Sequence, residues 1–125
     1  MVITGASGAG KSALGLELMA WGCRLVADDR TLLTLHDGAP WASCAPGLEG
    51  MIEARFVGLL HAHGELSSRV SFAVDLDRVE TERLPPPRHV TWLGVRVPLL
   101  HKAATPGFAA AILQYLKAGR LSPDS

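Results

Sequence analysis

The sequence predicts an α/β fold in which a mixed, largely antiparallel sheet surrounds a helix that follows a glycine-rich loop. Val2, Ile3 and Thr4 form a short β-branched run that leads directly into glycines, as a strand leads into a loop. The segments predicted as strands outnumber the helical ones, and some are close enough to pair as antiparallel hairpins. With 125 residues, 48% of them hydrophobic, the chain fits one domain that spans residues 1–125.

Periodicity and turn residues predict the other elements. Apolar residues of the first helix leave Lys11, Ser12 and Glu17 on its other faces, and Gly22 supplies a left-handed cap. Apolar residues alternate through segment 70–76, as they do in a strand with one buried face. In chain order we expect a helix over residues 11–20, strands over 24–27 and 31–35, a turn over 36–40, an irregular segment over 41–50, a strand over 70–76, a proline-ended loop over 80–87, a strand over 89–97, a helix over 108–116 and a disordered tail over 121–125.

Composition excludes several functional classes. Twelve basic and twelve acidic residues cancel, which gives no support for a nucleic-acid or anionic-membrane partner. No stretch approaches the roughly 20 apolar residues of a membrane span. Cys23 and Cys44 form no C-x-x-C pair, so we expect reduced thiols in the cytoplasm. The start resembles the last residues of a strand, and we expect further N-terminal strands to be absent.

The glycine-rich loop matches the phosphate-binding pattern G-x-x-x-x-G-K-[ST] at every required position. Its glycines allow amide N–H groups to point into one concavity, at which the next helix directs its positive end. Lys11 would reach the β- and γ-phosphates of ATP, and the Ser12 hydroxyl would bind Mg²⁺. The alternative is a glycine-rich turn with a helix cap at Ser7 or Ser12. The predicted nucleotide-binding residues are Gly5, Ala6, Ser7, Gly8, Ala9, Gly10, Lys11 and Ser12.

Acidic residues after the loop are candidates for catalysis and metal binding. Asp28 and Asp29 are adjacent, so in an extended chain at most one of them faces the phosphates. One could act as a general base, and the other could orient it or hold the metal through water; a polar turn is the alternative. On a strand, Glu53 and Arg55 would share a face as a metal ligand beside a cation, or as a surface ion pair.

Three blocks of the sequence resemble the catalytic domain of HPr kinase/phosphorylase. They are the phosphate loop, the "RLVADD" of residues 24–29 and the "IEARFVG" of residues 52–58, which is similar to the family's "IE-x-RG-x-G". The resemblance implies a fold akin to the nucleotide-binding core of PEP carboxykinases. It also implies transfer of the ATP γ-phosphoryl group to a serine of the phosphocarrier HPr, or of its nitrogen-type paralogue, by a homo-oligomer. The chain resembles the short members of the alphaproteobacterial type, and the N-terminal regulatory domain of longer members is expected to be absent.

The resemblance also implies roles for individual residues. Lys11 would neutralise the phosphates, and Ser12 and Glu53 would bind Mg²⁺. The Asp28–Asp29 pair would supply the base, with Asp29 the first choice. Arg55 lies in the segment tied to catalysis, and the "ERL" of residues 82–84 resembles the family's later "DRL", which makes Arg83 a further catalytic candidate.

Two departures from the family pattern bear on activity. Phe56 stands where the signature has glycine, so we expect its ring to fill space near the catalytic loop or to force a different backbone. Residues 106–111 lack the basic charge that inorganic phosphate would need, so the sequence predicts a kinase without phosphorolysis. Two alternatives remain, a nucleotide sensor with little turnover and a small-molecule kinase or NTPase of the same core.

Overall fold

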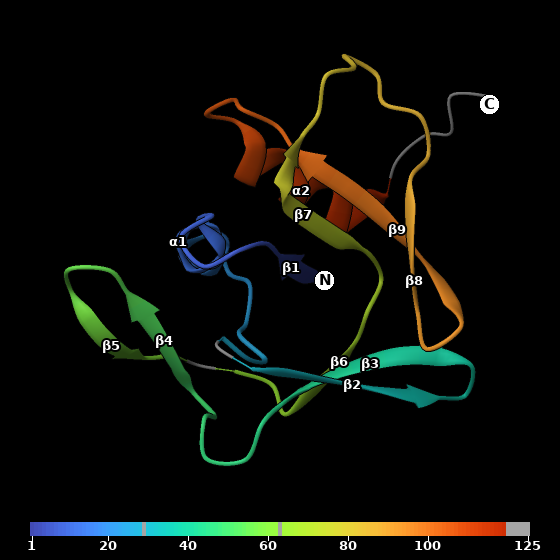
Figure 1. Cartoon of the computed structure of the whole chain (residues 1–125). Coiled ribbons are helices and arrows are strands. Elements are labelled where there is room, and N and C mark those ends of the chain that lie inside the picture. Colours follow the sequence, from blue (N-terminus) through green and yellow to red (C-terminus); the bar gives the residue numbers. More distant parts are fainter. Residues whose placement is uncertain (29, 63, 120–125) are drawn as a thin grey trace.

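The computed structural model describes residues 1–28, 30–62 and 64–119. Its elements are short strands and two helices, and the helices lie one near each end of the chain (Figure 1). In chain order they are β1 (Val2–Thr4), α1 (Lys11–Ala20), β2 (Thr31–His36), β3 (Ala39–Cys44), β4 (Met51–Ala54), β5 (Gly58–His61), β6 (Ser67–Arg69), β7 (Ala73–Val79), β8 (His89–Trp92), β9 (Val95–Lys102) and α2 (Phe108–Ala118).

The strands form three sheets rather than one. A four-stranded mixed sheet has the order β1-β7-β9-β8, in which β1 and β9 run parallel to β7 and β8 runs antiparallel to β9. Strands β2, β3 and β6 form an antiparallel sheet, and β4 and β5 form a separate hairpin beside α1 (Figure 1). Because β1 and β7 are parallel neighbours, their carboxyl ends lie together, with Thr4 opposite Asp75.

The core has two parts, one on each face of β7. Phe72, Val74 and Leu76 pack against both helices, which cover one face of the mixed sheet. Ala73 points the other way, into a cluster shared with β3 and β9. This two-sided burial follows from the alternation of side chains along a strand. The buried helix partners are Leu14, Leu18, Ala109 and Ile112, and the second cluster contains Ala42, Val70 and Val97.

The α/β class and the excess of antiparallel pairings are confirmed, but several boundaries differ. Residues 24–27 form no strand; the segment makes a single isolated bridge between Leu25 and Gly64. Segment 41–50 is not wholly irregular, since β3 pairs with both β2 and β6. Segment 89–97 is not one strand but parts of a hairpin, because Leu93 and Gly94 adopt positive φ and turn the chain.

The remaining predictions need smaller changes. The strand expected over 70–76 begins at Ala73 and continues to Val79. The helix expected over 108–116 is confirmed and extends to Ala118. The predicted tail lies outside the described residues. Within the described part of the chain, neither helix has the length and apolar character needed to cross a bilayer.

Candidate functional site

The glycine-rich loop connects β1 to α1 with a backbone that glycine alone adopts readily. Gly8 and Gly10 have φ of 87° and 100°, and Gly10 is the N-cap of α1. No side chain caps this helix, so a cap at Ser7 or Ser12 does not explain the motif. The N–H groups of a helix's first turn have no acceptor within the helix, so this end of α1 can bind an anion.

Lys11 folds back over the start of the loop. Its Nζ donates hydrogen bonds to the carbonyl oxygens of Gly5 and Ala6. The loop also contains a turn in which the amide of Ala9 donates to the carbonyl of Ala6 at 3.0 Å. The ammonium group therefore lies on the same loop as the amides, where it can add a full positive charge for a bound polyanion.

Ser12 and Asp28 are in direct contact, although the sequence separates them by sixteen positions. Ser12 Oγ donates to Asp28 Oδ1 at 2.8 Å, and the other oxygen of Asp28 accepts from the backbone amide of Glu53 at 2.9 Å. Asp28 thus joins the start of α1 to β4, and a hydroxyl and a carboxylate meet at one point. A cavity of about 300 Å³ opens here, lined by Lys11, Ser12 and Asp28 together with apolar residues of β1 and α1. Asp29 lies outside the described residues.

Glu53 and Arg55 do not share a strand face, contrary to expectation. Strand β4 ends at Ala54, and Arg55 lies in the turn, closed by a hydrogen bond from the Val57 amide to the Ala54 carbonyl. The two side chains form no ion pair with each other in the described residues. Glu53 stays beside Asp28 through its backbone, with an exposed side chain, and Arg55 is exposed in the turn.

The expectation that the Phe56 ring fills space near the catalytic loop is wrong. Its ring is fully exposed, so it fills no space near the loop, and its φ is 67°, a conformation that glycine adopts without strain. The turn therefore holds a phenylalanine in a conformation that favours glycine. Val57 and Leu59 of the same hairpin are 73% and 74% exposed.

Arg83 lies in the loop between β7 and β8, which leaves the same edge of the sheet as the glycine-rich loop. It is exposed and has no hydrogen bond or ion pair with Ser12 or Asp28. The base of its loop is closed by Glu80 and Arg88, whose side chains form paired hydrogen bonds of 3.0 and 2.9 Å. The hydrogen bond from Arg88 lowers the pKa of Glu80 to about 2, and bonds from the Glu82 and Thr81 amides assist.

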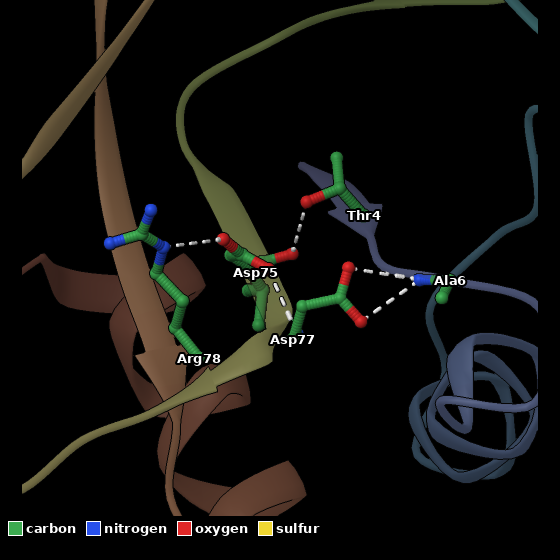
Figure 2. A network of polar contacts seen from close by, with 6 residues as sticks. Thr4, Ala6, Asp75, Asp77 and Arg78 are labelled. Carbon is green, nitrogen blue, oxygen red and sulfur yellow. Dashed lines mark hydrogen bonds and ion pairs between the residues drawn. The ribbon is translucent and has the colours of Figure 1, made fainter.

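Sequence reasoning missed two acidic residues at the end of β7. Asp77 accepts the backbone amide of Ala6 with both carboxylate oxygens, each at 3.0 Å, and its own amide donates to Asp75 at 2.9 Å (Figure 2). Arg78 forms an ion pair with Asp75, with 3.9 Å between Arg78 Nε and Asp75 Oδ2 (Figure 2). The available signal was an apolar strand followed by acids, the pattern that accompanies phosphate loops.

No cluster of three or more His, Cys, Asp or Glu side chains suited to a metal occurs in residues 1–28, 30–62 and 64–119.

Comparison with known proteins gives consistent matches. Residues 1–108 match the HPr serine kinase C-terminal domain family. The HPr kinase/phosphorylase of Verminephrobacter eiseniae is 40% identical over 98 residues, which cover 68% of this chain and 31% of that protein. That of Streptococcus sanguinis is 37% identical over 91 residues, covering 66% of this chain and 29% of that protein. The chain therefore spans about a third of the length of these curated relatives.

A solved structure has the same fold. The Hpr(Ser) kinase/phosphatase from Coxiella burnetii superposes with a TM-score of 0.77 over 92% of this chain and 79% of that chain. The sequence identity is 23%, so this likeness bears on the fold. It agrees with the mixed α/β architecture expected from the sequence.

Proposed function

We propose, since the chain belongs to the HPr serine kinase C-terminal domain family, that it is the catalytic domain of a kinase that phosphorylates a serine of the phosphocarrier HPr with ATP. The observation that carries the proposal is the contact between Ser12 and Asp28. It joins a hydroxyl at the start of α1 to a carboxylate from a distant segment, beside a loop whose backbone amides can take phosphate.

The glycine-rich loop would bind the phosphates of ATP. Amides between Gly8 and Ser12 would donate hydrogen bonds to the β- and γ-phosphate oxygens, helped by the helix dipole. Lys11 would exchange its carbonyl partners on Gly5 and Ala6 for phosphate oxygens. This exchange is favourable because a hydrogen bond between two charged groups is stronger than one to a neutral carbonyl.

The residues around Ser12 fit a Mg²⁺ ion. Magnesium prefers oxygen ligands and commonly uses one or two carboxylates together with substrate phosphates and water. Ser12 and Asp28 offer a hydroxyl and a carboxylate, and Glu53, whose backbone amide bonds to Asp28, would add a second carboxylate by turning its exposed side chain towards them. Bound Mg²⁺ would neutralise charge on the β- and γ-phosphates.

Asp29 would serve as the base. Both oxygens of Asp28 already accept hydrogen bonds, from Ser12 and from Glu53, which suits a residue that orients others. Its neighbour Asp29 would accept the proton of the acceptor serine as the serine oxygen attacks the γ-phosphorus. The bond from that phosphorus to the bridging oxygen breaks, and ADP leaves with the electron pair. Positioning and charge neutralisation supply most of the rate enhancement.

The substrate would be HPr or its nitrogen-type paralogue, and the kinase would work in the cytoplasm as a homo-oligomer. Arg55 and Arg83 would act from exposed turns, which substrate binding could order around the transferred phosphoryl group. The relatives are named for a second, dephosphorylating activity as well. Residues 106–111 carry no basic side chain to hold inorganic phosphate, so we propose kinase activity without phosphorolysis.

The test is transfer of radiolabelled phosphate from Mg-ATP to HPr, with an HPr variant that lacks the acceptor serine as a control. Lys11→Ala should abolish nucleotide binding. Asp29→Asn should keep binding and lower transfer by roughly 10²- to 10⁴-fold. Lys117→Ala, which removes an exposed cation from the last turn of α2, should change neither.

The alternatives predict different results in the same assay. Loss of ATP without labelled HPr would indicate a small-molecule kinase or NTPase. Binding of ATP without turnover, unchanged by Asp29→Asn, would indicate a nucleotide sensor. Absence of Mg-ATP binding to the folded wild-type protein would refute the kinase assignment.

A further inference from the structure

The carboxylate of Asp77 holds the first amide of the glycine-rich loop. The nitrogen of Ala6 lies 3.0 Å from each carboxylate oxygen of Asp77, and 71 positions separate the two residues in the sequence (Figure 2). Asp77 lies near the end of β7, and its own amide is bound by Asp75. The carboxylate is therefore presented by a strand whose apolar residues Ala73, Val74 and Leu76 are buried in the core.

The held amide is at the start of the loop and not in the part that would face phosphate. Phosphate-binding amides are those nearest the helix N-terminus, here from Gly8 to Ser12. Asp77 draws Ala6 towards β7, at the other end of the loop. Its contact can therefore persist while those later amides bind an anion.

Close packing at Gly5 supports the same conclusion. A Cβ atom at Gly5 would lie 3.3 Å from the Cβ of Leu76 and 3.1 Å from that of Ala9. The chain between β1 and the loop thus passes tightly against β7, and the Asp77 contact follows directly after this close approach. Backbone packing fixes one residue of the loop, and a charged hydrogen bond fixes the next.

We propose that Asp77 is a positioning residue, which anchors the start of the glycine-rich loop so that its later amides are preorganised for the phosphates of ATP. The inference rests on the proposed function for its consequence in nucleotide binding. The anchoring itself concerns only this chain. Preorganisation raises affinity because the ordering of the loop is already complete before the ligand arrives.

Two other roles for Asp77 predict different changes in nucleotide affinity when the residue is replaced. If its carboxylate competed with phosphate for the loop, removing it would strengthen nucleotide binding. If it were a magnesium ligand, asparagine would be a poor replacement and the loss would depend on Mg²⁺. An anchor needs only an acceptor oxygen, and its negative charge near the phosphates is a disadvantage.

The experiment compares Asp77→Ala and Asp77→Asn by calorimetry with ATP, with and without Mg²⁺. Asp77→Ala should weaken binding by roughly five- to tenfold, which is less than the full effect of losing one hydrogen bond to a charged acceptor because the contact acts on binding only through the order of the loop. Asp77→Asn keeps an acceptor and should bind at least as tightly as wild type. Glu17→Ala, which removes an exposed charge from α1, is the matched control and should bind normally. Unchanged or tighter binding by Asp77→Ala, or a Mg²⁺-dependent loss in Asp77→Asn, would overturn the proposal.

A second measurement does not need nucleotide. Hydrogen exchange of the Ala6 amide, followed by NMR in the free protein, should be slow in wild type and Asp77→Asn and fast in Asp77→Ala. Wild-type protein that fails to bind ATP but shows this exchange pattern would refute the kinase and retain the anchor. Equal exchange in all three proteins would refute the anchor alone.

Discussion

Replacing Phe56 by glycine should stabilise the protein, although the change deletes a large apolar side chain. Phe56 has a φ of 67° in the turn between β4 and β5, and its ring is fully exposed. Deleting the ring therefore costs no hydrophobic stabilisation, because the ring buries no apolar surface in the folded protein. What changes is the backbone, because glycine occupies the left-handed region without the clash that a Cβ atom causes there.

The magnitude follows from two opposing contributions. A left-handed conformation costs an ordinary residue roughly 1–2 kcal/mol, which glycine recovers. Glycine also gains freedom in the unfolded chain, which lowers the stability of the folded state by roughly 0.5–1 kcal/mol. The free energy of unfolding should therefore rise by about 0.5–1 kcal/mol. For a chain of 125 residues this raises Tm by about 2–5 °C.

The assay is urea and thermal unfolding of Phe56→Gly beside Val57→Gly. Val57 is 73% exposed in the same turn but does not have a positive φ, so glycine there should lower stability by about 0.5–1 kcal/mol. Because the two substitutions should change the free energy of unfolding in opposite directions, their comparison isolates the contribution of the backbone conformation. If Phe56→Gly loses as much stability as Val57→Gly, the left-handed strain is absent and the reasoning fails. A loss that grows with protein concentration would show that the ring is buried against a second copy.

Three further predictions concern the supports of the site. Asp28→Ala removes the acceptor of two hydrogen bonds and should lower the free energy of unfolding by about 2 kcal/mol in urea, with Asn losing about half of that. Gly64→Ala places a Cβ 2.3 Å from the carbonyl oxygen of Leu25, so the chain must shift; roughly 1–3 kcal/mol of stability should be lost in the same measurement. Glu80 has a folded pKa of about 2 against an ordinary 4.5, so its pairing with Arg88 stabilises the fold above pH 4.5 and the contribution disappears as the pH falls towards 2. Glu80→Gln should therefore lower Tm at neutral pH, and the difference from wild type should shrink in acid.

The loop and its helix could be predicted because their signals are local. A strand, a run of glycines and a helix with Lys11 and Ser12 at its start follow one another along the chain, so no long-range information was needed. The adjacent acids Asp28 and Asp29 were expected near the phosphate site without a choice of which one faces it, and the structure places Asp28 in contact with Ser12.

The errors had two causes, a segment that depends on a distant partner and a turn that its residues did not signal. Residues 24–27 have the composition of a strand, yet among the residues that the structure describes their only bridge is between Leu25 and Gly64, and no continuous ladder forms there. The β8–β9 hairpin was missed because Leu93 and Gly94 are not one of the usual turn pairs, although both adopt positive φ. Tertiary pairing decided the first segment, and a local two-residue turn decided the second.

Asp77 shows why the phosphate-loop motif alone does not determine the geometry of its loop. The motif specifies the glycines and the helix start, but the loop is held by partners from outside it. β7 supplies Asp77 to the Ala6 amide, and the segment before β2 supplies Asp28 to the Ser12 hydroxyl. One anchor fixes the start of the loop and the other its end, so the amides between them are constrained from both sides. A chain with the same eight residues but without these two carboxylates would have a loop that is free at both its start and its end. Its affinity for ATP should fall, because binding must then order both parts of the loop.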